Sequence, residues 1–199
     1  KKALPLLING LEKLEYRGYD SSGIAVINPE TNSITCNKAE GKLHNLINNL
    51  NDENIPGTVG IGHTRWATHG KPELKNAHPH IDGSGTIAVV QNGIIENFQD
   101  LKNKLEEEGI IFNSDTDTEV IPHLIQRELN TLSKLNLENN GSTLLVAVRN
   151  VISDLEGSYA LAVLWADAPT SLVVARKQAP LIIGLGEGEF ICASDTPAI

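Results

Sequence analysis

The sequence predicts a single α+β domain in which layers of helices cover mainly antiparallel sheets. Strand patterns arrive in adjacent runs toward both ends of the 199-residue chain, and three helical patterns form a block between them. This order differs from the βαβα alternation that a parallel sheet needs. The chain shows no internal repeat, low-complexity linker or shift in composition that would divide it. We therefore expect one domain over residues 1–199, long enough to bury a substantial core.

The first half of the chain is predicted to form two helices and four strands. A leucine stripe at helical spacing begins at Leu4 and ends near Gly18. Two apolar runs on either side of Asn28-Pro29-Glu30 predict a hairpin. A later strand is expected to end at Asn92-Gly93, a dipeptide typical of turns. The expected ranges are 23–28 and 33–38 for the hairpin, 43–50 for the second helix, 58–64 and 86–91 for the other strands, and 65–84 for an irregular stretch.

The second half is predicted to contain three helices followed by four strands. Apolar residues at helical spacing define the helices, and Gly109 stops the first of them. The helices are expected at 98–108, 118–129 and 143–155, and the strands at 159–165, 172–176, 181–185 and 190–193.

Composition excludes several classes of protein. A net charge of −9 argues against a nucleic-acid or anionic-membrane partner. The longest apolar run, 160–166, is too short to span a bilayer, and no signal-peptide pattern is present. Cys36 and Cys192 lie in separate strand patterns, which is neither a disulfide framework nor a zinc spacing. We expect a cytoplasmic protein with two packed, unpaired cysteines.

Three segments combine polar side chains with irregular backbone: 62–70, 91–95 and 114–119. Each has an ordinary explanation. Asn92-Gly93 is a turn dipeptide, Asp115 or Asp117 is suited to capping a helix, and Arg65 alone could be a surface charge. Together they supply a carboxylate, a guanidinium, an amide donor and a glycine N–H. Those groups can hold an amino acid by both ends, or stabilise an oxyanion.

Four histidines raise the alternative of a metal site. His63, His69, His78 and His80 fall within eighteen positions, and a histidine-rich metallohydrolase is one hypothesis. No cysteine, HExxH or matching acidic spacing accompanies them. We therefore predict no metal and no cofactor.

Several motifs resemble, in the same order, those of one family. They are 14–23 (LEYRGYDSSG), 63–70 (HTRWATHG), 76–80, 92–97 and 115–119, with 157–160 and 193–195 near the end. The chain is similar over its whole length to the glutaminase domain of glutamine:fructose-6-phosphate aminotransferase (isomerising), a class II glutamine amidotransferase. Other class II amidotransferases, such as amidophosphoribosyltransferase, carry looser variants of these motifs.

This resemblance implies both a fold and a reaction. The fold is a four-layer αββα sandwich of the N-terminal-nucleophile hydrolase type. The reaction is hydrolysis of the side-chain amide of L-glutamine to glutamate and ammonia. In the full-length enzyme the ammonia aminates fructose 6-phosphate to glucosamine 6-phosphate, so the implied partners are a sugar-phosphate isomerase domain of the same chain and a second copy in a homodimer.

The resemblance also implies roles for individual residues. Asn92 and Gly93 would form the oxyanion hole, and Gly93 would also contact glutamine. Arg65 would pair with the substrate α-carboxylate, for which a guanidinium fork is well shaped, and Asp117 with the α-ammonium group. Trp66, Thr68 and His69 would belong to the loop that closes over glutamine. Arg17 would lie near the nucleophile.

The resemblance implies that the nucleophile is an N-terminal cysteine on a short apolar strand, which residues 1–199 lack. The α-amino group of that cysteine would act as base, since an α-amino group titrates near neutral pH. The present sequence begins with Lys1, and neither Cys36 nor Cys192 can supply that amine. We therefore expect the 199-residue chain alone to be inactive. A glutamine-binding regulatory module without catalysis is the alternative, and the residues upstream of Lys1 would distinguish the two.

Overall fold

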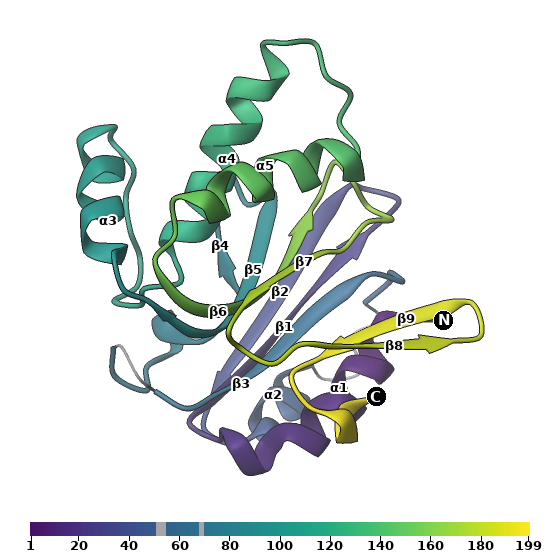
Figure 1. Cartoon of the computed structure of the whole chain (residues 1–199). Helices are drawn as coiled ribbons and strands as arrows, with labels where there is room; N and C mark the ends of the chain where they lie inside the picture. Colours follow the sequence, from purple (N-terminus) through teal and green to yellow (C-terminus); the bar gives the residue numbers. More distant parts are fainter. Residues whose placement is uncertain (51–54, 68–69) are drawn as a thin grey trace.

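Two layers of helices enclose two layers of sheet in the computed structural model, which describes residues 1–50, 55–67 and 70–199 (Figure 1). The layer that contains the N-terminus holds α1 (Ala3–Leu14) and α2 (Leu43–Leu50). The opposite layer holds α3 (Phe98–Glu107), α4 (Val120–Ser133) and α5 (Gly141–Ser153). The predicted αββα sandwich is confirmed. No helix of the described residues is long and apolar enough to cross a membrane.

The strands between these layers pair antiparallel. One sheet has the order β2-β1-β3, and the other has the order β4-β5-β6-β7. A separate hairpin, β8-β9, lies beside α1 near the chain end (Figure 1). The bounds are β1 Ser21–Asn28, β2 Ser33–Glu40, β3 Gly60–Arg65, β4 His80–Ile81, β5 Ile87–Ile95, β6 Gly157–Trp165, β7 Val173–Lys177, β8 Ile182–Gly186 and β9 Glu189–Ala193. Short 3₁₀ turns occupy Glu15–Arg17, Leu74–Asn76 and Thr196–Ala198.

Each pair of adjacent layers has its own apolar cluster. Leu11 and Leu46 belong to the cluster between α1, α2 and the first sheet. Ala25 and Leu164 belong to the one between the two sheets. The largest lies between the second sheet and α3–α5 and includes Ile121. Burial on both faces explains why the central strands read as nearly continuous apolar runs.

The prediction that a strand ends at Asn92-Gly93 is wrong, because β5 continues through this dipeptide to Ile95. Asn92 pairs with Ala160 on β6, and Gly93 pairs with Tyr159. The backbone of Gly93 has φ +110°, and a side chain there would collide with the carbonyl oxygen of Ser158. Glycine is needed here for close approach of β6, and not for a turn. The strand therefore carries Asn92 past the edge of the short neighbour β4.

Candidate active site

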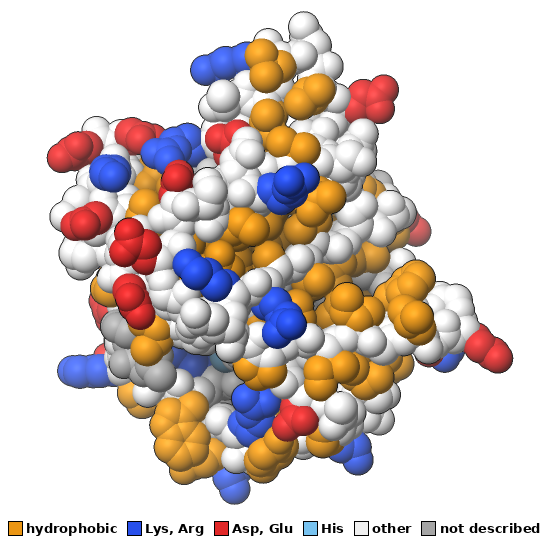
Figure 2. Space-filling model, viewed as in Figure 1, with side chains coloured by type: hydrophobic (Ala, Val, Ile, Leu, Met, Phe, Trp, Pro, Cys, Tyr) orange, Lys and Arg blue, Asp and Glu red, His pale blue; other side chains and the backbone are white. Residues whose placement is uncertain are grey.

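Every predicted site residue that lies within the described ranges lines one cavity of about 1010 Å³. These residues are Arg17, Arg65, Trp66, Asn92, Gly93 and Asp117. Thr68 and His69 lie outside the described residues. The cavity runs along α1, β3 and β9 and reaches β5, β6 and β7. Figure 2 shows hydrophobic side chains exposed across the middle of this face, between the β8-β9 hairpin and the upper helical layer.

Arg65 ends β3 and is 4 % exposed, so it is not the surface charge that a lone arginine suggests. Its guanidinium lies 3.8 Å from the carboxylate of Asp20. It donates to the carbonyl of Gly70 at 3.2 Å and to that of Lys71 at 3.3 Å. Burial lowers the pKa of Arg65, and the carboxylates of Asp20 and Asp117 oppose that shift. The side chain is thus a buried cation held in one orientation at the cavity wall.

Asp20 was not among the predicted site residues, although it lies within the 14–23 motif. Its carboxylate accepts from the backbone N–H of Ala67 and, at 3.0 Å, from the hydroxyl of Ser21. It therefore fixes the corner at which the chain leaves β3. Trp66 at this corner is 61 % exposed and packs edge-on against Tyr19, with ring centroids 5.3 Å apart. Asp20 is visible in the sequence as an acidic residue within this motif, but only the structure shows that its charge lies beside the buried Arg65.

Asp117 lies in the loop before α4 and is 3 % exposed. Its Oδ2 accepts from the backbone N–H of Ile95 at 2.7 Å, which ties this loop to the end of β5. The ordinary explanation, in which Asp115 or Asp117 caps the helix, is wrong. The N-cap position of α4 is Glu119, and its side chain makes no capping hydrogen bond.

Glu119 instead binds the backbone of the loop that precedes α4. Its carboxylate accepts from the backbone N–H groups of Asn113 at 2.8 Å and Ser114 at 2.6 Å, and from the Ser114 hydroxyl at 2.5 Å. His123 lies 3.7 Å away. Burial opposes ionisation of Glu119, but these donors outweigh it and lower its pKa to about 2. A buried carboxylate with several donors stays charged and rigid, so it fixes the backbone on which Asp117 sits.

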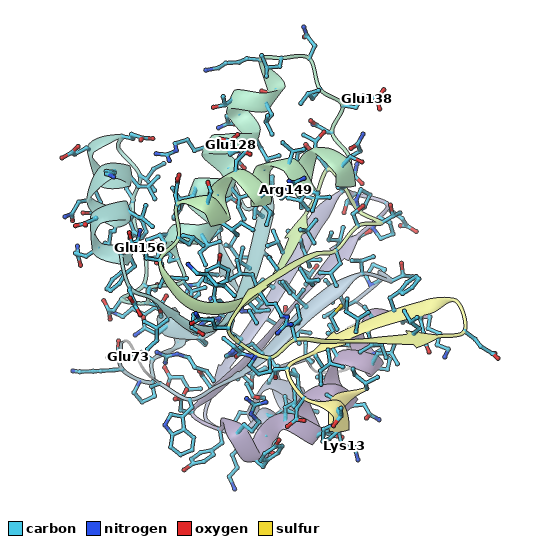
Figure 3. The ribbon with its side chains drawn as sticks, viewed as in Figure 1. Lys13, Glu73, Glu128, Glu138, Arg149 and Glu156 are labelled. Carbon is cyan, nitrogen blue, oxygen red and sulfur yellow. The ribbon has the colours of Figure 1, made fainter. Side chains whose placement is uncertain are left out.

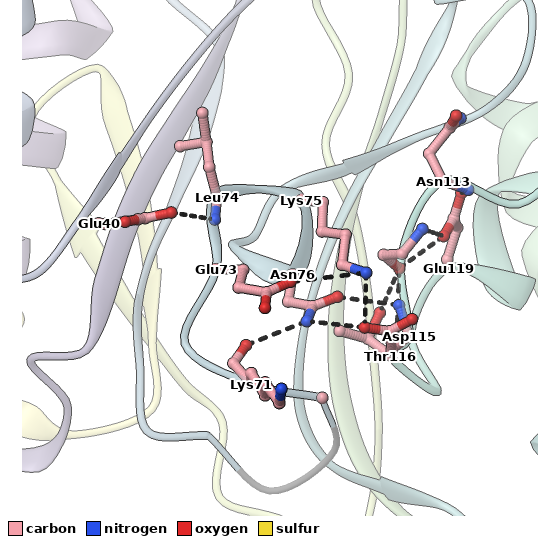
Figure 4. A network of polar contacts seen from close by, with 12 residues as sticks. Glu40, Lys71, Glu73, Leu74, Lys75, Asn76, Asn113, Asp115, Thr116 and Glu119 are labelled. Atoms are coloured by element: carbon pink, nitrogen blue, oxygen red, sulfur yellow. Dashed lines mark hydrogen bonds and ion pairs between the residues drawn. The ribbon is translucent and has the colours of Figure 1, made fainter.

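A second set of contacts joins this loop to the one that follows β3 (Figure 4). Asn76 is fully buried; its Oδ1 accepts from the Asp115 N–H at 2.8 Å, and its Nδ2 donates to the Lys71 carbonyl at 3.0 Å. Lys75 pairs with the Asp115 carboxylate at 2.9 Å. Since Arg65 also binds the Lys71 carbonyl, the loops that carry Arg65 and Asp117 form one hydrogen-bonded unit.

His63, His78 and His80 form a packed cluster, hereafter the histidine cluster, of which His63 and His78 line the cavity. The rings of His63 and His78 are stacked with centroids 4.3 Å apart, and His80 meets His78 edge-on at 4.8 Å. His80 Nε2 lies 3.0 Å from the Thr116 hydroxyl, and His78 Nδ1 accepts from the Gln91 N–H at 3.3 Å. Among the described residues no group of three or more possible ligands is arranged to hold a metal ion. These rings serve as packed, hydrogen-bonding core residues.

The histidine cluster predicts loss of stability in mild acid. Burial lowers the pKa of His63 to about 4 and that of His80 to about 3, from the ordinary 6.5. The neutral forms stabilise the fold fully above pH 6.5, and this stability is lost as the pH falls toward 4, because the unfolded chain binds protons first. His63 alone can account for up to about 3 kcal/mol.

Urea denaturation between pH 7 and 5 measures this effect, in a range where Glu119, whose pKa is about 2, stays ionised in the folded state. The His80→Gln variant, whose amide can still donate to Thr116, should lose less stability on acidification than the wild type. The exposed His44→Gln variant should behave as the wild type does. Equal pH dependence in His80→Gln and wild type would contradict the prediction.

Arg17 and Cys192 also line the cavity, whereas Cys36 is not among its lining residues. Arg17 is exposed, donates at 3.4 Å to the backbone and hydroxyl oxygens of Ser194, and lies 3.8 Å from Asp195. It thereby ties the 3₁₀ turn after α1 to the end of β9. Burial raises the pKa of the Cys36 thiol on β2 and of the Cys192 thiol on β9. A raised pKa reduces the thiolate fraction, so neither is suited to act as a nucleophile.

Solved structures with a similar architecture include two enzymes that match nearly the whole chain. One is glutamine phosphoribosylpyrophosphate amidotransferase from B. subtilis complexed with ADP and GMP; it is 29% identical, with a TM-score of 0.81, and the match covers 100% of this chain and 40% of that one. Another is described as the allosteric regulatory enzyme of purine biosynthesis, at 30% identity and a TM-score of 0.80, covering 98% and 40%. The fold, with the buried charges of Arg65 and Asp117 at its cavity, defines an amidotransferase domain of the N-terminal-nucleophile hydrolase class.

Residues 63–199 match the family model of the glutamine amidotransferase domain, and the chain belongs to this family. Curated relatives described as glutamine–fructose-6-phosphate aminotransferase [isomerizing] include those of Thermosynechococcus vestitus, 56% identical over 197 residues, and Pyrococcus horikoshii, 52% identical over 198 residues. The matches cover 99% and 100% of this chain. The chain spans about 30% of the length of these relatives. The resemblance predicted from the motifs is confirmed.

Proposed function

We propose that this domain hydrolyses the side-chain amide of L-glutamine to glutamate and ammonia, within a longer protein that uses the ammonia to convert fructose 6-phosphate to glucosamine 6-phosphate. The observation that carries the proposal is the shared cavity of Arg65, Asp117, Asn92 and Gly93. The named activity of the relatives supports the sugar-phosphate acceptor. Their greater length supports an isomerase domain beyond this one. Cytoplasmic location and a homodimer stay predictions.

Arg65 and Asp117 bind the amino-acid end of glutamine in this proposal. A guanidinium fork matches the α-carboxylate, and the Asp117 carboxylate matches the α-ammonium group. Burial of both side chains strengthens these pairs, because water competes for them less than at the surface. With that end fixed, the side-chain amide extends toward Asn92 and Gly93, with Arg17 on the wall that leads to β9.

The reaction needs a nucleophile and a stabilised oxyanion. The thiol proton of a cysteine passes to the α-amino group of the same residue; the thiolate attacks the amide carbon, the C–S bond forms and the carbonyl electron pair moves to oxygen. The Asn92 side-chain N–H and the Gly93 backbone N–H stabilise that oxygen. The C–N bond then breaks and ammonia leaves with the proton. Water then attacks the thioester carbon and gives a proton to the α-amino group; the C–O bond forms, the C–S bond breaks, the thiolate takes that proton and glutamate is released.

The cavity offers room for the strand that carries this cysteine. Within the described residues β3 pairs only with β1, and β9 pairs only with β8. Both strands line the cavity along their full length, above an apolar floor from α1. Phe190 on β9 lines this cavity and is 76% exposed, so the cavity wall offers apolar surface to a further strand. A strand paired between β3 and β9 would close one continuous sheet.

Glutamate release from glutamine by the full-length protein tests the proposal, with glucosamine 6-phosphate measured when fructose 6-phosphate is present. Substitution of the N-terminal cysteine by alanine should abolish release. Cys36→Ala and Cys192→Ala should keep activity within about twofold, since the raised pKa of each thiol makes it a poor nucleophile. If the full-length protein binds glutamine but releases no glutamate, the proposed hydrolysis is wrong and the glutamine-binding regulatory module is favoured.

A further inference from the structure

The amide of Asn92 can face the cavity with either of two chemically opposite ends. Its NH₂ group would stabilise a developing oxyanion, whereas its carbonyl oxygen would repel one. Rotation of the terminal amide by half a turn exchanges the two ends with little change in shape. Something must therefore hold one orientation. The neighbour in a position to do so is His63, whose Nε2 lies 2.8 Å from Asn92 Oδ1.

The contact between His63 and Asn92 fixes the direction of the hydrogen bond. An amide oxygen only accepts, so the imidazole must donate from Nε2. His63 Nδ1 is buried and makes no hydrogen bond within the described part of the chain, which is better tolerated for a bare lone pair than for an N–H donor. Burial is the largest cause that lowers the pKa of His63, and the Arg65 cation adds to it; together they outweigh the hydrogen bonds with Asn92 and the Gln91 backbone and the charge of Asp20, so the ring is neutral. A neutral Nε2–H imidazole satisfies all of these conditions at once.

His63 is itself held in place by its neighbours. It lies on β3, opposite Gly23 of β1, and its ring stacks on that of His78 with an interplanar angle of 18°. The His78 ring is fixed in turn, since its Nδ1 accepts from the backbone of Gln91 at 3.3 Å. The Gln91 side chain accepts from the Thr118 hydroxyl at 2.6 Å. A ring packed this way cannot turn, so its tautomer decides the amide orientation, and the Nε2–H tautomer requires Asn92 Oδ1 to face the ring.

We propose that His63 is a positioning residue, a neutral imidazole that donates from Nε2 to Asn92 Oδ1 and so keeps the Asn92 NH₂ group turned toward the reacting amide oxygen. The inference rests on the proposed glutamine hydrolysis. His63 contacts neither glutamine nor the nucleophile in this arrangement and acts only through Asn92.

Two substitutions in the full-length protein separate the donor from the ring. His63→Phe keeps an aromatic ring for stacking on His78 but removes the donor, and it should lower kcat for glutamate release about 10- to 50-fold with KM nearly unchanged. His63→Gln restores an amide donor and should recover part of the rate. Exposed His44→Gln is the control and should have no effect.

The double variant His63→Phe/Asn92→Ala decides whether His63 acts through Asn92. Once Asn92 is gone, loss of His63 should cost nothing more, so the double variant should hydrolyse glutamine as fast as Asn92→Ala alone. If the double variant instead loses rate by the product of the two single-variant factors, His63 acts independently of Asn92 and the proposal is wrong.

Nitrogen NMR of labelled histidine gives a readout that does not depend on activity. His63 should appear as the neutral Nε2–H tautomer from about pH 6 to 8, since its pKa is about 4. The Nδ1–H tautomer would mean that the Asn92 oxygen faces the cavity, and would overturn the assignment. If the wild type releases no glutamate, the proposed function fails while the tautomer still tests the geometry.

Discussion

Asn92→Ala is expected to lower kcat for glutamine hydrolysis by about 100- to 1,000-fold, with little change in KM. The donor assigned to Asn92 meets charge that appears only when the amide carbon becomes tetrahedral. In the proposed binding mode, ground-state binding depends instead on Arg65 and Asp117, which the substitution leaves in place. The closeness of β6 to Gly93 keeps the adjacent backbone fixed, so the loss should be chemical and not structural.

Steady-state glutamate release by the full-length protein measures this effect. Asn92→Asp has almost the same shape and can still accept from His63, but it lacks the amide donor and adds a negative charge. It should therefore be at least as slow as Asn92→Ala. Asn150→Ala on α5, which removes an exposed amide bonded to Glu128, should leave kcat unchanged. A raised KM with unchanged kcat would identify Asn92 as a ground-state contact instead.

The layered fold could be predicted because local signals and burial agree. The stripe in α1 and the hairpin turn after Asn28 each specify one structure, and the order of strands and helices excludes a parallel sheet. Element ends were placed less well. The helix expected from residue 118 begins at Val120, and Thr118 lies in the turn before it, where its carbonyl accepts from the Ile121 N–H. The Thr118 hydroxyl donates to Gln91 on the sheet, a tertiary contact that no local sequence pattern predicts.

The candidate site was only partly accessible from the sequence. Arg65, Asn92 and Asp117 stand out as polar groups beside strand ends, and the structure brings them to one cavity. The residues that support them were missed. From the sequence, Glu119 is typical of the start of a helix, and the closely spaced histidines are typical of a metal site. Their hydrogen-bonding roles become visible only when their partners in the folded structure are known. Asn92-Gly93 was misread because the approach of β6, and not a turn, requires the glycine.

Arg65→Ala should weaken glutamine binding by about 1.5–3 kcal/mol, which is about 10- to 150-fold, because a charge-assisted pair in a closed pocket is lost. The matched control is Arg149→Ala on α5, where an exposed arginine lies in the outer helical layer (Figure 3). That variant should bind glutamine as the wild type does. Calorimetric titration of both variants, beside thermal melting to exclude unfolding, measures the difference.

A substrate analogue shows whether the lost energy belongs to the α-carboxylate. 4-Aminobutanamide is glutamine without that carboxylate, so the wild type should bind it much more weakly than glutamine. Arg65→Ala should bind the two ligands almost equally, since the discriminating cation is gone. Arg65→Lys should fall between, because it keeps the charge and loses the planar fork that also binds the carbonyls of Gly70 and Lys71. If Arg65→Ala still prefers glutamine as strongly as the wild type does, the carboxylate binds elsewhere, and the buried guanidinium serves only to join β3 to the loop behind it.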